Sequence, residues 1–261
     1  MENSFGGKCA LITGASRGQG AAEARLFAQK GAAVIVADVL DAEGAALVKD
    51  IRAARGQAEY IHLDVANEAD WQKAIAFAKE KFGGLHVLVN NAGVALRGKN
   101  IGATTREDWD RVLSINLTGP FLGTRAAAPL LRDSGGGAII NIGSTAGING
   151  HFAAAYSAAK WGLRGLTKCA AMEYADWGIR VNAVHPGIVT TPMVEGSDAF
   201  VEAMTQVTAL NRPATAEDVA RCVVFLAGDD ARYLTGIDLP VDGGFTALGV
   251  YREVWKRAIR T

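Results

Sequence analysis

The chain has 261 residues, of which 49% are hydrophobic and 21% charged, so it can bury the core of one large globular domain or two small ones. Lysine and arginine together number 27, as do aspartate and glutamate, and the formal net charge is zero. This composition excludes disordered and fibrous proteins and gives no indication of a nucleic-acid or membrane partner. Glycine or charge interrupts every long apolar stretch, and the start of the chain does not resemble a secretory signal.

Strand-like and helix-like segments alternate along the chain. The strand candidates are the short apolar runs CALIT, AVIVAD, AEYIHLD, HVLVNNAG, GAIINIGS, RVNAVHPG and IDLPVDGG. Alanine-rich amphipathic segments of helix length separate them, and runs that are apolar on both faces are typical of a buried parallel sheet. The sequence therefore predicts an α/β, single-domain doubly wound (Rossmann) fold over residues 1–261, with an about seven-stranded parallel sheet flanked by helices.

The first strand ends in TGASRGQG, which places three glycines at a strand-to-helix turn. Glycine lets the backbone approach a pyrophosphate, and the N-terminus of the following helix attracts that charge. A tight turn without a ligand is the alternative. The cofactor contacts expected in this loop are Gly14, Ser16, Arg17, Gly18 and Gly20.

Asp38 ends the second strand, at the spacing where an acidic side chain binds the adenosine ribose of a dinucleotide. Its carboxylate would repel a 2′-phosphate, which favours NAD over NADP. Arg17 indicates the opposite, because a guanidinium group can bind that phosphate. We expect NAD, since Asp38 lies where the discriminating oxygen should be.

The ends of the third and fourth strands carry further candidate contacts. Asp64, followed by Val65, is expected either to accept a hydrogen bond from adenine or to cap the helix that starts near Asn67. The segment NNAG lies where an open α/β sheet binds its ligand, although it would equally suit a tight turn. The cofactor contacts expected there are Asn91, Ala92 and Gly93.

Prolines interrupt the next helical pattern, in NLTGPFLGTRAAAPLLRDSGGG. Pro120 and Pro129 predict a kink or local break in this helix. The three cysteines, Cys9, Cys169 and Cys222, are far apart and lie in apolar runs, so we expect reduced core thiols and a cytoplasmic location. The four histidines show no metal-ligand spacing, and we expect no metal ion.

The segment STAGINGHFAAAYSAAK places Tyr156 four residues before Lys160 and twelve after Ser144. On a helix, residues four apart share one face, so the tyrosine and the lysine can enter the same cleft. A neighbouring ammonium group, together with an oxidised nicotinamide, would lower the pKa of the tyrosine toward the working pH. This pattern is therefore suited to proton transfer.

At this point the chain resembles the short-chain dehydrogenase/reductase family, from Thr13 to about Gly244. The resemblance rests on TGASRGQG, Asp38, NNAG, Asn116 in SINLTGPF, Ser144, YSAAK and HPGIVTTP, in this order. It implies a nicotinamide cofactor that performs the hydride transfer and an assembly that is commonly a homotetramer.

The resemblance also implies roles for individual residues. Tyr156 would exchange the proton with the substrate oxygen, Ser144 would hydrogen-bond that oxygen, and Lys160 would hold the nicotinamide ribose. Asn116 would keep its helix irregular and support a water that connects Lys160 to solvent. In HPGIVTTP, His185 is expected to be a satisfied strand-end histidine. The cofactor contacts implied for this segment are Pro186, Gly187, Ile188 and Thr190.

The substrate is expected to be hydrophobic, because the segments after the catalytic positions are mostly apolar and offer no basic cluster. The candidate contacts are Val94, Leu96, Ile148, Asn149, Met193, Phe200 and Met204. The sequence thus predicts an NAD-dependent oxidoreductase of a cyclic or steroid-like secondary alcohol and its ketone. The alternatives are a 3-oxoacyl thioester reductase that uses NADP, a methyltransferase, and a non-catalytic dinucleotide-binding regulator.

Two segments toward the C-terminus have open interpretations. Residues 190–209 mix turn signals with apolar residues, which is typical of a substrate lid or of an ordinary surface connection. Residues 249–261 form a C-terminal extension with apolar residues at helical spacing. We expect an amphipathic helix there that packs on another subunit or on its own.

Overall fold

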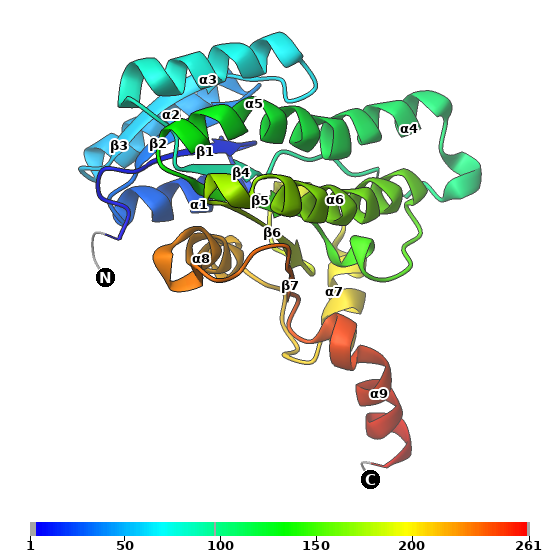
Figure 1. The fold of residues 1–261 in the computed structure, drawn as a ribbon. Helices are drawn as coiled ribbons and strands as arrows, with labels where there is room; N and C mark the ends of the chain where they lie inside the picture. The colour runs from blue at the N-terminus through cyan, green and yellow to red at the C-terminus, as the bar shows by residue number, and fades with distance from the viewer. Residues whose placement is uncertain (1–3, 97, 260–261) are drawn as a thin grey trace.

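Each of the seven predicted runs forms a strand, and all seven pair in parallel in one sheet of order β3-β2-β1-β4-β5-β6-β7 (Figure 1). The computed structural model describes residues 4–96 and 98–259, so the first three and last two residues of the predicted domain and extension lie outside the described ones. The predicted fold class is confirmed. The strands are β1 (Cys9–Thr13), β2 (Ala33–Asp38), β3 (Gln57–His62), β4 (Val87–Asn90), β5 (Gly137–Ile142), β6 (Ile179–Pro186) and β7 (Asp238–Val241).

Helices cover both faces of the sheet, because successive strand side chains point to opposite sides. Ala10 and Ile12 of β1 belong to one apolar core, whereas Leu11 belongs to the other. The first core packs against α1 (Gly18–Gln29), α2 (Asp41–Ala53) and α8 (Ala216–Ala227). The second packs against α3 (Glu68–Phe82), α5 (Gly119–Asp133) and α6 (Ala154–Glu173).

The strand order reverses between β1 and β4, which lie side by side although two strands and their helices separate them in the chain. The connections that follow these strands therefore leave the sheet in different directions. Ligands of doubly wound folds bind in the crevice that opens there, at the carboxyl ends of the strands. Both the glycine loop and NNAG follow strands at this point.

The helix irregularity lies in front of Pro120. Between α4 (Arg106–Leu113) and α5, residues Ser114–Thr118 form a π-helix. Proline has no backbone N–H, so Pro120 cannot bond the carbonyl four residues before it, that of Asn116, and the local spacing widens. At Pro129 α5 continues, so a break of the helix does not occur there.

The segments after β6 are less embedded in the body. Residues 190–197 contain a short 3₁₀ turn, Pro192–Val194, and are followed by α7 (Asp198–Val207). The C-terminal helix α9 (Phe245–Ala258) begins four residues before the predicted extension and projects away from the body (Figure 1). The prediction of a helix is thus confirmed, and its start is corrected.

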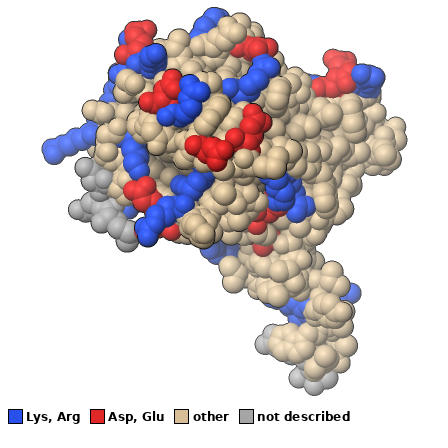
Figure 2. Space-filling model, viewed as in Figure 1, with Lys and Arg blue, Asp and Glu red and all other residues tan. Residues whose placement is uncertain are grey.

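The surface charge is mixed, and the three cysteines differ in exposure. On the face shown in Figure 2, positive and negative side chains are interspersed over the body. Cys9 is buried, but Cys222 is only half-buried and Cys169 is exposed, so the prediction of core thiols is wrong for Cys169. Within the described ranges, no helix combines the length and the hydropathy needed to cross a membrane.

Candidate active site

The glycine loop packs tightly against the connection that follows β4. A Cβ atom on Gly14 would lie 2.7 Å from the Cα of Ala92, and one on Gly20 would lie 2.4 Å from the Gly14 carbonyl oxygen. Gly14 also has a φ of +62°, which disfavours any other residue. Arg17 occupies the N-cap of α1 without a side-chain capping bond, so the first amides of that helix are not capped from within.

NNAG is fixed to the first strand through Thr13, which the sequence did not single out. The amides of Asn91 and Ala92 both donate to the Thr13 hydroxyl over 3.0 Å. The side chain of Asn91 donates to the carbonyls of Thr13 and Gly14 over 2.9 and 3.1 Å. The two loops at the switch point therefore form one hydrogen-bonded unit.

The Asp38 carboxylate is buried beside the glycine loop. One of its oxygens accepts a 2.9 Å hydrogen bond from the amide of Ser16, and the other accepts from Val39 and Leu40 over 2.8 and 3.2 Å. Three backbone donors thus fix its orientation at the end of β2. A carboxylate in this position suits a ribose diol better than a phosphate.

One of the two roles predicted for Asp64, at the end of β3, is wrong. The N-cap of α3 is Asn67, whose side chain accepts from Ala69 over 2.9 Å. Asp64 is exposed and accepts from Ala66 over 2.9 Å, so its assignment as the cap of this helix is corrected. Val65, next to it, is buried.

Asn116 lies in the π-helix and is fully buried. Its side-chain amide donates to the carbonyls of Val94 and Val112 over 2.9 and 3.0 Å, and its oxygen accepts from the Val94 amide over 3.2 Å. A Cβ atom on Gly93 would lie 2.7 Å from that oxygen and 3.8 Å from the Lys160 ammonium nitrogen. Asn116 therefore joins the NNAG connection to α4, and Gly93 lies close to both Asn116 and Lys160.

Tyr156 and Lys160 lie on one face of α6, with the Lys160 nitrogen 5.6 Å from the centre of the Tyr156 ring. The Lys160 nitrogen donates to the Ile142 carbonyl at the end of β5 over 2.7 Å. Ser144 follows that strand, and its hydroxyl oxygen accepts from the amide of Ala146 over 3.1 Å. The structure thus brings the serine, the tyrosine and the lysine together.

Burial dominates the acid–base properties of this group. It raises the pKa of Tyr156 above its ordinary value of 10.0, and the hydrogen bond with Ser144 opposes that rise. It also lowers the pKa of Lys160 to about 8. In the protein alone, the pKa of the tyrosine therefore moves in the direction opposite to the one expected from its lysine neighbour.

The HPGIVTTP segment begins at the end of β6 and is held by backbone hydrogen bonds to Val241 and Ala214. The Gly187 amide donates to Val241 over 3.0 Å, which ties the turn after Pro186 to β7. Ile188 is buried, and its carbonyl accepts from Ala214 over 2.9 Å, so one of its lone pairs is already used. Thr190 is exposed at the start of the 190–197 segment.

The candidate substrate residues fall into two groups. Val94 and Leu96 pack with Tyr156 in a small apolar cluster between α4 and α6. Phe200 of α7 makes an edge-on contact with Phe152, with ring centres 5.9 Å apart. The remaining candidates lie on the two segments that flank this contact: Ile148, Asn149, Met193 and Met204.

Sequence analysis missed two aromatic residues beside the tyrosine. His151 stacks on Phe152 with ring centres 4.3 Å apart, and its ring centre is 6.1 Å from that of Tyr156. The available signal was the aromatic pair between Ser144 and Tyr156 in the sequence. Together with Phe200, these rings make one wall of the group aromatic.

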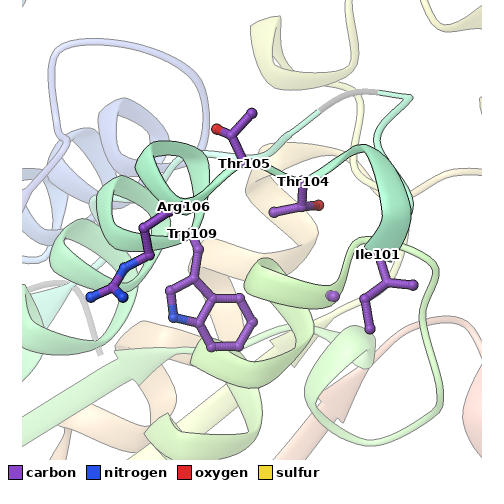
Figure 3. Close-up of a pocket in the computed structure, with 6 residues that line it drawn as sticks. Ile101, Thr104, Thr105, Arg106 and Trp109 are labelled. Carbon is purple, nitrogen blue, oxygen red and sulfur yellow. The ribbon is translucent and has the colours of Figure 1, made fainter.

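A hollow of about 310 Å³ opens next to the apolar cluster, and none of the predicted substrate residues lines it. Figure 3 shows Trp109 and Arg106 projecting from α4, with Ile101 on the turn before that helix. Ala154, two residues before Tyr156, completes its lining with Thr104 and Thr105. The predicted contact Ile188 lines a separate hollow of about 200 Å³.

Comparisons with known proteins bear on the family and the fold of the chain. A family model described as enoyl-(acyl carrier protein) reductase matches residues 14–246. The chain is 45% identical to a trans-4-hydroxycyclohexanecarboxylate dehydrogenase of Sinomonas cyclohexanicum, over 92% of this chain and 93% of that protein. It is 46% identical to a 3-alpha-(or 20-beta)-hydroxysteroid dehydrogenase of Mycobacterium tuberculosis, over 92% and 90% of the two chains.

A cyclohexanol dehydrogenase of an Acinetobacter species is 41% identical, over 95% of this chain and 98% of that protein. Among solved structures, that of a proposed gluconate dehydrogenase from Agrobacterium tumefaciens superposes with a TM-score of 0.89 at 33% identity. The superposition covers 94% of this chain and 98% of the other.

Proposed function

The chain belongs to the short-chain dehydrogenase/reductase family and interconverts a secondary alcohol and its ketone; from this premise we propose that the alcohol is cyclic and the cofactor is NAD. Members of this family use a nicotinamide dinucleotide, which when bound accepts or delivers the hydride. The grouping of Ser144, Tyr156 and Lys160 supports the reaction, and the observation that carries the choice of NAD is the oriented Asp38 carboxylate beside the glycine loop.

Tyr156 is proposed as the acid/base. In alcohol oxidation its phenolate takes the hydroxyl proton as the carbon gives up a hydride, and ketone, reduced cofactor and one proton result. Because the Ser144 oxygen already accepts from Ala146, the Ser144 hydroxyl proton is available for the substrate oxygen or the tyrosine. The charge of Lys160 favours the phenolate and opposes the effect of burial.

The residues present fit a dinucleotide. The glycine loop and the uncapped start of α1 suit the pyrophosphate, and Asp38 suits the adenosine ribose. The fixed carboxylate of Asp38 supports NAD, since a 2′-phosphate there would meet an oriented negative charge. Lys160 keeps two of its three N–H groups for the nicotinamide ribose beyond its bond to Ile142.

A ring-shaped alcohol is supported by the aromatic wall of His151, Phe152 and Phe200 and by the named substrates of the relatives. Apolar rings pack favourably against such side chains. The other residues predicted to contact the substrate or the cofactor stay part of this proposal.

We also propose a homotetramer in the cytoplasm. The apolar residues of α9 are exposed on a helix that projects from the body, which supports contact with another copy. The three cysteines are free thiols, as expected in a reducing compartment.

The test is to follow absorbance of the reduced nicotinamide with purified protein, NAD or NADP, and a panel of cyclic, steroidal, aryl and linear secondary alcohols. The proposal expects the highest kcat/KM for a ring alcohol with NAD. Turnover confined to NADP and 3-hydroxyacyl thioesters would establish the acyl reductase instead. Tight binding of NADH without turnover of any panel member would indicate a regulator.

A further inference from the structure

A buried histidine lies directly behind Ser144. His185, near the end of β6, is 0% exposed, and its Nδ1 atom is 3.3 Å from the backbone nitrogen of Ser144. A Cβ atom on Gly143 would lie 2.3 Å from the same Nδ1. The imidazole therefore packs against the backbone of β5 at the point where the strand ends and the serine begins.

Asp238, the first residue of β7, holds the far side of this ring. Its Oδ1 atom is 2.9 Å from the His185 Nε2. Its Oδ2 atom accepts from Lys168 over 2.6 Å and from Arg164 over 3.2 Å, and both cations belong to α6. Burial alone would raise the pKa of Asp238, but these hydrogen bonds outweigh it and hold the pKa at about 2, so the carboxylate is ionised at neutral pH.

Arg164 connects the same carboxylate to the turn that follows the serine. It donates to the carbonyl of Gly147 over 3.0 Å, at the end of the 3₁₀ turn Thr145–Gly147. Asp238 thus reaches the serine segment twice, through His185 at its start and through Arg164 three residues later. Neither side chain is among the proposed substrate contacts.

The ring nitrogen that carries the proton determines whether His185 forms a hydrogen bond with the amide or with the carbonyl of Ser144. Burial lowers the pKa of His185, so the ring is neutral at neutral pH and carries one N–H. With that proton on Nε2, facing the ionised Asp238, the Nδ1 lone pair accepts from the Ser144 amide. A proton on Nδ1 would instead face the Ser144 carbonyl, 3.2 Å away, and leave Asp238 without its donor.

We propose that His185, oriented by Asp238, is a positioning residue for Ser144: it accepts the Ser144 amide and so fixes the backbone from which the serine hydroxyl reaches Tyr156. The kinetic consequence rests on the proposed function, whereas the structural consequence does not. Sequence spacing could not indicate this pair, because 41 residues separate the histidine from the serine and 53 separate it from the aspartate.

Two substitutions separate the two contacts of the ring. In His185→Asn, the amide oxygen can replace Nδ1 and keep the bond to Ser144. In His185→Gln, the longer amide reaches toward Asp238 and leaves the Ser144 amide without its acceptor. We expect His185→Gln to lower kcat by about tenfold with unchanged NADH affinity, because small displacements of a catalytic group are costly, and His185→Asn to recover most of that loss.

A matched control is available at the amino-terminal ends of the strands, whereas His185 lies near the carboxyl end of β6. His86, just before β4, accepts the amide of Cys9 at its Nδ1 over 3.0 Å, in the same way as His185 but far from Ser144. His86→Gln should leave kcat unchanged. Adding His185→Gln to Ser144→Ala should have little further effect on kcat, because the histidine acts through the serine.

Hydrogen exchange tests the structural consequence without any substrate. The Ser144 amide should exchange faster in His185→Gln than in wild type, His185→Asn or His86→Gln. In wild-type protein, ¹⁵N-histidine spectra should show His185 protonated at Nε2, a measurement that needs no variant to fold. A proton on Nδ1, equal losses in both His185 variants, or losses that add fully to Ser144→Ala would overturn the proposal. If wild type turns over no alcohol, the proposed function fails while exchange and spectra still decide the role of His185.

Discussion

Two regions border the candidate site, and they are held in place by different interactions. The site floor is formed by Asn116, Ser144, Tyr156 and Lys160. Hydrogen bonds with backbone groups fix Asn116, Ser144 and Lys160, and Asn116 and Lys160 are almost fully buried. The site cover, residues 190–207 with α7, has Met193 and Phe200 exposed by 44% and 37% and meets the floor side through the Phe152–Phe200 contact.

This difference assigns separate properties to the two regions. A fixed, buried group suits proton transfer, since its geometry is set before the substrate arrives. A segment with few buried contacts can adjust to different rings. Changes in the floor should therefore affect kcat, whereas changes in the cover should affect KM and substrate choice.

The largest effect is expected from Tyr156→Phe, which removes one hydroxyl and keeps the ring. Without its acid/base, the protein should lose roughly 10³-fold in kcat, within the range that positioned proton transfer contributes, and NADH affinity should hardly change. Tyr174→Phe, at the other end of α6, is the control and should keep normal turnover. Near-normal kcat in Tyr156→Phe would refute the role given to the floor.

The second-largest effect is expected in the free energy of unfolding, and it concerns Glu23 on the helix that follows the glycine loop. Glu23 of α1 is fully buried, one of its oxygens has no partner among the described residues, and burial raises its pKa from 4.5 to about 8, against the Gln19 hydrogen bond. A raised pKa means that the folded state binds the proton more tightly than the unfolded state. Stability should therefore be greatest below pH 4.5, as far as this group is concerned, and decline as the pH rises toward about 8.

Glu23→Gln should remove this decline and raise the free energy of unfolding near pH 8 by a few kcal/mol, of the order implied by a shift of this size. Thermal unfolding at several pH values, with and without the substitution, measures the difference. Glu80→Gln, which changes an exposed glutamate on α3, should leave the pH dependence unchanged. Parallel curves for wild type and Glu23→Gln would show that Glu23 is ionised in the folded protein.

A smaller effect is expected in the cover. Phe200→Ala removes the edge-on contact with Phe152. An aromatic pair of this kind contributes about 1 kcal/mol of interaction free energy. KM for ring alcohols should rise several-fold while kcat stays near its normal value. Phe225→Ala provides the control, because Phe225 is similarly exposed, by 45%, but lies on α8 under the sheet. A fall in kcat without a change in KM would place Phe200 with the floor rather than the cover.

The same division governs what the sequence could predict. The strands β1 and β2 match their predicted runs because continuous apolar residues indicate burial on both faces. Tyr156 and Lys160 could be placed on one face because their spacing follows helix geometry, whereas Asn116 and Ser144 were located by the resemblance to the family. The Phe152–Phe200 contact and the His185–Asp238 pair could not be predicted, because they depend on how distant segments meet. The pKa of Tyr156 was expected to fall for a related reason: spacing indicates its charged neighbour but not the burial that outweighs it.

The smallest effect on catalysis, and the clearest on assembly, is expected from α9. Val250 and Tyr251 are 78% and 83% exposed, and Val254 and Trp255 are about half exposed, so this one helix presents several exposed apolar side chains. Where α9 meets its own chain, Arg252 and Lys256 reach the Gln206 carbonyl at the end of α7. Removing residues 250–261 should therefore lower the mass seen by light scattering. The kcat of the enzyme should stay unchanged, and KM should rise modestly because α7 loses its support. Arg257→Gln, which changes the charged side of the same helix, should leave the mass as it is. An unchanged assembly after the truncation would mean that α9 serves the cover of its own subunit and that other surfaces join the copies.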